Sequence, residues 1–252
     1  MSTDLPLAAH LEGLRTALVA FVRYADRAGL RAGVPTCPDW TVRNLVAHQG
    51  MVHRWAAAIV RGERLDPDAA ERDGQVSPDP VEWLRDGAIE LAQALTDAPE
   101  DLKVLRFLND PPPARQFWAR RQCHETTIHA VDALSAALGR YPVAADTWIT
   151  REVALDGIDE LLTGFVTRSV SRLRTAEPVT IAVRPDDAER SWLVAVGPEP
   201  AVTTRHVGPV SGDVLLEGSA VALYLTLWNR SDEVEPDRGL DLWRNAAQVR
   251  WG

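Results

Sequence analysis

The chain has 252 residues, of which 46% are hydrophobic and 25% charged, and its formal net charge is −9. This composition is typical of a globular protein with a substantial core, and it excludes the collagenous and disordered classes. Since no block of Lys and Arg stands out, we expect neither nucleic acid nor an anionic membrane surface as a partner. No apolar run approaches the roughly 20 residues that span a bilayer, and no signal peptide is expected.

The two cysteines, Cys37 and Cys123, are too few for a disulfide framework. A reducing cytoplasm is therefore the expected location. Neither cysteine has the spacing of a Cys-x-x-Cys or Cys/His motif, so both are interpreted as buried thiols rather than nucleophiles.

The first two thirds of the chain has the apolar spacing of helices. Over residues 5–31, apolar side chains recur every three to four positions, which predicts one buried helical face. The proline-containing segment 34–41 follows, with a helix cap expected at Asp39 or Thr41. The polar stretch at 63–80 is rich in helix breakers and is predicted to be a loop. Further helices are predicted at about 42–61, 80–96, 114–138 and 146–166.

After Arg168 the pattern changes to short runs rich in β-branched residues. Such runs predict strands, and an apolar segment at 219–228 predicts one more helix. The predicted strands cover residues 179–183, 191–197, 201–207 and 211–216. We therefore predict a mainly α N-terminal domain at 1–167, built as a bundle of four to five helices, and a smaller α+β domain at 168–252.

Three residues on two of the predicted helices have the character of metal ligands. Glu125 and His129 are four residues apart, so they lie within about 40° of each other on one helix face. His48 lies between Leu45 and Val52 and faces the core or its rim. Ligands from facing helices of a bundle converge on one interior point, and two imidazoles with one carboxylate form a catalytic zinc site with one open position.

The spacing leaves simpler explanations open. A Glu-x-x-x-His pair is often only a charge pair on an exposed helix. A buried histidine is more often a hydrogen-bonded core residue than a ligand, and spacing alone does not bring His48 to the other two residues.

Three stretches of the chain resemble the mycothiol-dependent maleylpyruvate isomerase family of actinobacteria, and they occur in the family's order. They are CPDWTVRNLVAH at 37–48, HETTIHAVDA at 124–133 and GSAVALYLTLWNR at 218–230. The resemblance implies a DinB-like four-helix bundle in which His48, Glu125 and His129 bind a divalent metal, typically zinc. It also implies that mycothiol supplies its sulfur to the open position. Gln49 departs from the family, which often has an apolar residue there.

The implied chemistry is that of an activated thiol. A thiol on a dication is present as thiolate near neutral pH. Addition to a conjugated carbonyl, rotation and departure give cis–trans isomerisation, whereas displacement of a leaving group gives S-transfer. We therefore predict a mycothiol-dependent S-transferase or isomerase that acts on a small electrophile. The alternatives are a metal-dependent hydrolase on the same site and a non-catalytic bundle protein that binds a metal or small molecule.

The remaining candidates near these motifs are interpreted from their helical angle. His124 points about 100° away from the adjacent ligand and is expected to pack or support the site, while His53 lies about 140° round the helix from the first ligand and is expected outside it. Asp132, three residues after His129, either orients an imidazole or is a surface carboxylate.

Arg230 and the tryptophans complete the sequence-level candidates. The resemblance implies that Arg230 has a catalytic role by pairing with a substrate carboxylate, for which a guanidinium fork is suited. Its alternative role is a cation at a helix C-terminus. Trp40, Trp55 and Trp118 flank the predicted site. The oligomeric state is left open.

Overall fold

The computed structural model describes residues 5–235 and 241–247, which form parts of two compact units. One unit is helical and comprises residues 5–106 and 112–142. The other contains residues 107–111 and the described residues from 143 onward, and it holds the main sheet. The predicted combination of a mainly α N-terminal domain and an α+β C-terminal domain is confirmed.

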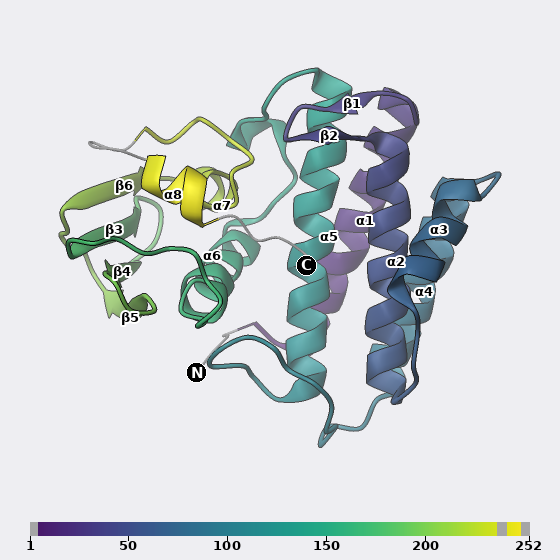
Figure 1. The fold of residues 1–252 in the computed structure, drawn as a ribbon, viewed down its shortest axis with the longest axis horizontal. Coiled ribbons are helices and arrows are strands. Elements are labelled where there is room, and N and C mark those ends of the chain that lie inside the picture. The colour runs from purple at the N-terminus through teal and green to yellow at the C-terminus, as the bar shows by residue number, and fades with distance from the viewer. Residues whose placement is uncertain (1–4, 236–240, 248–252) are drawn as a thin grey trace. The chain divides into compact units, whose positions relative to one another are not determined.

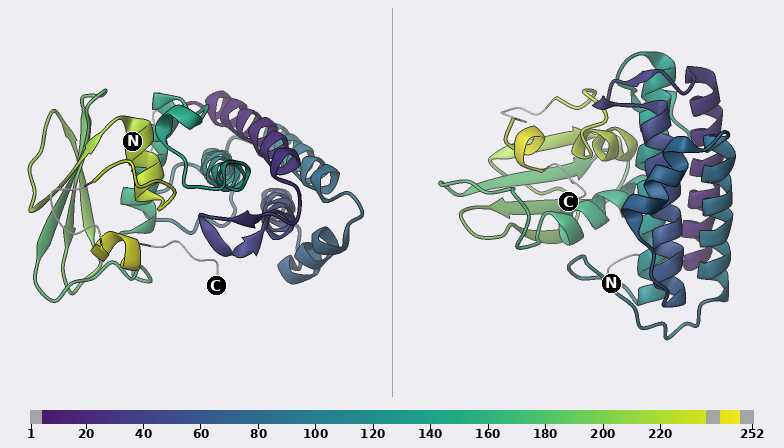
Figure 2. Two further views of the ribbon diagram at one scale, coloured as in Figure 1. Left: turned by 90° about the horizontal axis from the view of Figure 1, so that it is seen from above. Right: turned by 45° about the vertical axis from the view of Figure 1, so that its right-hand side comes forward.

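The helical unit is a bundle of long helices with one shorter helix beside it (Figure 1). Its helices are α1 (Leu7–Ala28), α2 (Val42–Arg61), α3 (Pro67–Val76), α4 (Pro80–Asp97) and α5 (Ala114–Leu138). Helix α1 packs chiefly against α5, and α2 packs chiefly against α4 and α3. The short strands β1 (Gly33–Val34) and β2 (Cys37–Thr41) pair antiparallel between α1 and α2. The end-on view in Figure 2 shows α5 lying inside the arc of the other helices.

Helix α2 begins with a complete capping box. The Thr41 side chain accepts a hydrogen bond from the backbone N–H of Asn44, and the Asn44 side chain accepts one from the backbone N–H of Thr41 at 2.9 Å. This reciprocal pair satisfies two N–H groups that the helix itself leaves without acceptors. Of the two caps expected from the sequence, the structure therefore uses Thr41 and not Asp39.

Helix α3 corrects the prediction of a loop at 63–80. The Asp66 side chain accepts hydrogen bonds from the backbone N–H groups of Asp68 and Ala69, and Pro67 occupies the first turn. An Asp cap followed by proline is a helix start, and this local signal outweighs the breaker-rich composition. The helix then buries Ala70 and Gly74.

The C-terminal unit is a four-stranded sheet in the order β5-β4-β3-β6, in which β4 runs antiparallel to both neighbours and β6 runs parallel to β3. Its strands are β3 (Val179–Pro185), β4 (Arg190–Val196), β5 (Val202–Val207) and β6 (Val214–Gly218). Its helical segments are η1 (Ala144–Asp146), α6 (Arg151–Asp159), η2 (Glu160–Phe165), α7 (Ala220–Leu227) and α8 (Asp241–Ala246). Figure 2 shows α6 and α7 on the same face of this sheet.

The division between the units lies after Pro142 and not after residue 167 as predicted. The helix predicted at 146–166 belongs to the C-terminal unit because α6 packs against α7. It is also joined to the sheet by polar contacts. The Asp159 carboxylate accepts hydrogen bonds from Trp192 Nε1 at 3.0 Å and from Arg205 Nε and Nη2 at 2.5 and 2.9 Å.

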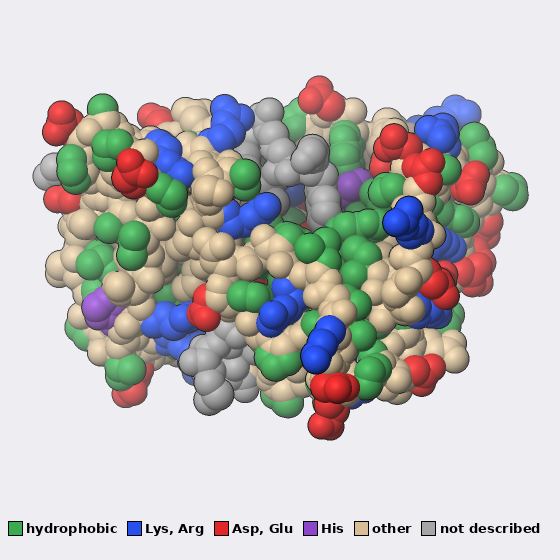
Figure 3. All heavy atoms as spheres, turned by 60° about the horizontal axis from the view of Figure 1, so that its bottom comes forward, with side chains coloured by type: hydrophobic (Ala, Val, Ile, Leu, Met, Phe, Trp, Pro, Cys, Tyr) green, Lys and Arg blue, Asp and Glu red, His purple; other side chains and the backbone are tan. Residues whose placement is uncertain are grey.

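None of the helices in the described ranges is long and apolar enough to cross a membrane. On the face drawn in Figure 3, acidic and basic side chains are interspersed among hydrophobic ones. Charge of one sign does not dominate that face.

Candidate metal centre

The three predicted ligands come together inside the helical unit. His48 projects from α2, and Glu125 and His129 project from adjacent turns of α5. One ligand atom from each residue lies within 4.8 Å of the other two. His129 Nε2 is 3.3 Å from Glu125 Oε1, and the two imidazole centroids are 5.3 Å apart. Packing of α2 against α5 thus supplies the convergence that sequence spacing could not show.

All three side chains are buried, with His48 and Glu125 5% exposed and His129 8% exposed. Burying a carboxylate and two imidazoles at one point is unfavourable unless their charges and hydrogen bonds are compensated. A divalent cation supplies that compensation, and nitrogen and carboxylate oxygen are donors that zinc accepts. The donor set therefore fits the metal that the family resemblance implies.

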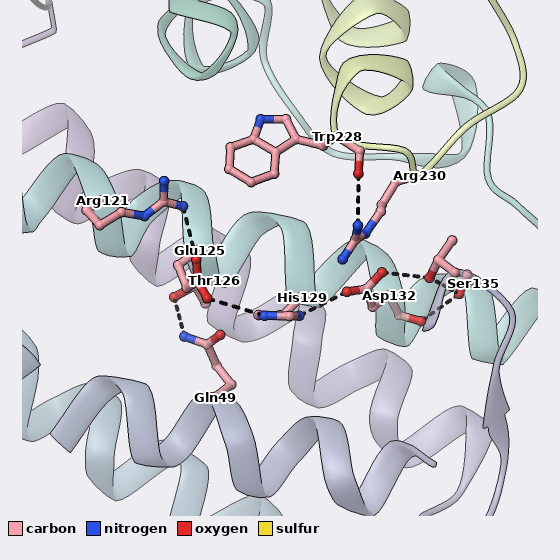
Figure 4. Close-up of polar contacts among 10 residues, drawn as sticks. Gln49, Arg121, Glu125, Thr126, His129, Asp132, Ser135, Trp228 and Arg230 are labelled. Atoms are coloured by element: carbon pink, nitrogen blue, oxygen red, sulfur yellow. Dashed lines mark hydrogen bonds and ion pairs between the residues drawn. The ribbon is translucent and has the colours of Figure 1, made fainter. Parts of the chain in front are cut away.

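Asp132 holds His129 from the side opposite the ligand cluster. Its Oδ2 accepts a hydrogen bond from His129 Nδ1 at 2.9 Å, which leaves Nε2 directed at Glu125 (Figure 4). Its Oδ1 accepts a hydrogen bond from Thr36 Oγ1 at 2.6 Å, and the Thr36 hydroxyl lies 2.9 Å from Ser135 Oγ. Asp132 is fully buried. Of the two interpretations left open by the sequence, the structure shows the orienting carboxylate.

Arg121 neutralises Glu125 and was not among the sequence candidates. Its Nη2 is 3.1 Å from Glu125 Oε2, one turn away on α5, so Oε1 remains directed at His129. Burial opposes ionisation of Glu125, but hydrogen bonding to His129 and the Arg121 charge outweigh it and lower the pKa of Glu125 to about 2. The i, i+4 spacing of Arg121 and Glu125 was a signal that sequence analysis could have used.

His129 lies between two carboxylates, Glu125 and Asp132. Burial lowers the pKa of His129, whereas the hydrogen bonds to Asp132 and Glu125 raise it, and the net result is a pKa of about 9. Without a metal, a proton on Nε2 therefore takes the place of the cation beside Glu125. A metal ion and a proton compete for the same nitrogen.

Glu71 on α3 was also missed, because it lies in the segment predicted to be a loop. Its Oε2 is 3.6 Å from His48 Nδ1. The Asp-Pro start of α3 was a sequence signal that could have revealed this helix. That signal could not have shown that the Glu71 carboxylate faces His48.

Trp40 forms an aromatic wall beside the two imidazoles. From β2, its ring lies 4.9 Å from the His48 ring at 60° and 6.1 Å from the His129 ring at 16°. Trp55 and Trp118, which the sequence also placed near the site, pack edge to face against each other at 5.4 Å. Of the tryptophans expected near the site, Trp40 is thus shown to lie beside the imidazoles of both His48 and His129.

His53 and His124 lie outside this ligand group. His53 Nε2 is 2.9 Å from the Thr126 hydroxyl, and Gln49 Nε2 donates to the same hydroxyl at 3.3 Å, which accounts for a polar residue after His48. Burial, reinforced by the Arg54 charge, lowers the pKa of His53 to about 3. The His124 ring packs edge to face against a histidine of α1 at 6.2 Å.

The cysteines differ in their exposure. Cys123 is buried, as expected, whereas Cys37 on β2 is only partly buried.

Arg230 lies in the C-terminal unit, just beyond α7. Asn229 adopts a left-handed φ of 59°, and the Arg230 backbone N–H donates to the Leu225 carbonyl at 2.7 Å, which closes the helix. The Arg230 guanidinium donates to the Trp228 carbonyl at 2.8 Å (Figure 4). This contact is that of a cation at a helix C-terminus. The role of Arg230 toward a substrate stays a prediction.

Two protein-family models together match most of the chain. The model of the mycothiol maleylpyruvate isomerase N-terminal domain matches residues 11–134, and the model of the C-terminal domain of the same family matches residues 152–243. No curated protein matches the chain in sequence.

Two solved structures share the fold. One is a crystal structure of mycothiol-dependent maleylpyruvate isomerase, at 17% identity and a TM-score of 0.59. The other is a histidine-to-alanine mutant of mycothiol-dependent maleylpyruvate isomerase, at 18% identity and a TM-score of 0.63. Each alignment covers 94% of this chain and 96% of the other. With both domain models matched in order, the chain belongs to the mycothiol-dependent maleylpyruvate isomerase family.

Proposed function

We propose that the protein is a metal-dependent enzyme that uses mycothiol as a thiol cosubstrate, acting as an isomerase or S-transferase on a small electrophile. The observation that carries the proposal is the convergence of His48, Glu125 and His129 within 4.8 Å in a chain of this family. Mycothiol and isomerisation are suggested by the family and by the two similar solved structures, which are mycothiol-dependent maleylpyruvate isomerases. S-transfer is the second reaction that the same activated thiolate could carry out.

His48, Glu125 and His129 would hold the ion, for which we propose zinc or a similar divalent metal. When bound, such a dication lowers the pKa of a thiol at its remaining coordination position. The protein contributes preorganisation. Asp132 fixes the His129 ring at 2.9 Å, and Arg121 at 3.1 Å keeps the Glu125 carboxylate anionic and oriented.

The sulfur that reacts is proposed to come from outside the protein, since the described ligand group contains no cysteine. In isomerisation, the thiolate adds to the carbon–carbon double bond conjugated with a carbonyl, the resulting single bond rotates, and the thiolate leaves. In S-transfer, the thiolate instead displaces a leaving group and remains on the product. The partly buried Trp40 ring offers a flat apolar surface beside the imidazoles. For Arg230 we retain the proposed role of pairing with a substrate carboxylate.

Cobalt substitution tests the proposal directly. A thiolate on Co²⁺ gives a sulfur-to-metal charge-transfer band that oxygen ligands do not give. We expect mycothiol to produce this band in the wild type and in the Cys37→Ser and Cys123→Ser variants. Metal uptake should be lost in His48→Ala and His129→Ala but retained in His53→Ala, because His53 contacts Thr126 rather than the ligand group.

Two results would redirect the proposal. If mycothiol leaves the cobalt spectrum unchanged while simple esters or amides are hydrolysed, the site is that of a hydrolase. If the purified protein neither carries nor takes up a metal, the non-catalytic bundle protein is the better explanation.

A further inference from the structure

Helix α3 places a carboxylate against the first candidate ligand. Glu71 Oε2 lies 3.6 Å from His48 Nδ1, an ion-pair contact longer than an ordinary hydrogen bond. We infer that Glu71 is a positioning residue of the metal centre: it accepts the Nδ1 proton of His48 when the metal is bound and so directs Nε2 at the ion. This inference rests on the metal site of the proposed function.

The position of α3 is set by a tryptophan held between two glycines. Trp83 of α4 lies against Gly50 of α2 and Gly74 of α3, where an added Cβ would come within 2.2 and 2.6 Å of the indole ring. Side chains larger than hydrogen are therefore excluded at the points where the three helices meet. The Arg54 guanidinium stacks over the indole ring of Trp83, with its central carbon 3.9 Å from the ring centroid. Gly74 is three residues after Glu71, so this contact also fixes the turn that carries the carboxylate.

Both ends of α3 are held as well. Asp66 caps its N-terminus. At the other end, Arg43 of α2 donates to the carbonyls of Gln75 at 3.0 Å and Ser77 at 3.2 Å. Ala70 belongs to an apolar cluster with residues of α2. The turn of α3 that carries Glu71 is thus positioned beside His48 by packing that does not involve the metal.

The two imidazoles then have unequal support. His129 is held by Asp132, whose side chain is fully buried, whereas the Glu71 side chain is 35% exposed. A carboxylate behind a ligand histidine orients the ring and raises its basicity, and removing one typically lowers metal affinity about 10–100-fold. Glu71 therefore gives α3 a function at the site although α3 contributes no ligand.

Metal affinity of the purified protein tests the inference. Zn²⁺ affinity is measured by competition with a chelator for the wild type, Glu71→Ala, Glu71→Gln and the matched control Asp73→Asn, an exposed carboxylate on the same helix. We expect affinity to fall about 10–100-fold for Glu71→Ala and in the same direction for Glu71→Gln, which preserves the side-chain size. Asp73→Asn should match the wild type. Circular dichroism of the metal-free variants checks that the helices are retained.

Nitrogen-15 NMR of the zinc-loaded protein gives a readout that a merely structural role would not change. The Nδ1–H signal of His48 should be protected from exchange in the wild type and in Asp73→Asn, and exposed to exchange in Glu71→Ala. The Nδ1–H signal of His129, held by Asp132, should persist in all variants as an internal control. Unchanged affinity together with an unchanged His48 signal in Glu71→Ala would overturn the inference while leaving the metal site intact. A wild type that binds no zinc would overturn the metal site and this inference with it.

Discussion

Acid should destabilise this protein through His53, which is buried beside Thr126. Because burial lowers the pKa of His53 to about 3, below its ordinary value of 6.5, the folded state favours the neutral ring. The unfolded chain takes up the proton first as the pH falls below 6.5. Stability associated with His53 is therefore complete above pH 6.5 and is lost progressively as the pH falls toward 3.

The size of the effect follows from these two values. Between pH 7.5 and pH 5, linkage gives a loss of about 2 kcal/mol in the free energy of unfolding. The ring is fully buried, so solvent screening does not reduce this figure. Both pH values lie well above the folded pKa of about 3, so the loss reflects protonation of the unfolded chain.

Urea unfolding with chelator in every sample measures this loss without interference from metal release. The matched variant is His53→Gln, whose amide does not titrate and retains a donor for the Thr126 hydroxyl. We expect the wild type to lose about 2 kcal/mol more than His53→Gln between pH 7.5 and pH 5. Equal losses in the two proteins would refute the reasoning, because they would show that His53 is not held neutral.

Three further substitutions probe the site and its support. Asp132→Asn should lower Zn²⁺ affinity about 10–100-fold in chelator competition; wild-type affinity would contradict the orienting role. Arg121→Met should lower the free energy of unfolding by about 1.5–3 kcal/mol in urea, since it removes a charged hydrogen bond to the Glu125 carboxylate. An unchanged free energy of unfolding would contradict a stabilising role of the Arg121–Glu125 ion pair. Gly50→Ala should cost about 1–3 kcal/mol in thermal unfolding because its Cβ would lie 2.2 Å from a Trp83 ring atom. Gly33→Ala, with nothing within 4 Å, is the control, and equal melting temperatures would argue against the close packing.

Much of the local structure was determined by the sequence alone. Apolar periodicity located the long helices, and β-branched runs located the four strands of the sheet to within a few residues. The four-residue spacing of Glu125 and His129 placed both on one face of α5, where the structure has them. These features depend on interactions between near neighbours in the chain, which the helical and strand repeats record. The family resemblance was carried by motifs that likewise lie within single segments.

Only the tertiary structure decided which faces meet. His48 joins Glu125 and His129 because α2 packs against α5. Glu71 lies against His48 because the Trp83 ring, which packs between Gly50 of α2 and Gly74 of α3, seats α3 at this position. The extent of the C-terminal unit was decided in the same way, since α6 is periodic like the bundle helices but packs against α7. Periodicity states which side of a helix is apolar, and it contains no information on the partner that covers that side. The partners are separated by many residues along the chain, so the contacts that complete the site arise from packing and cannot be read from local sequence.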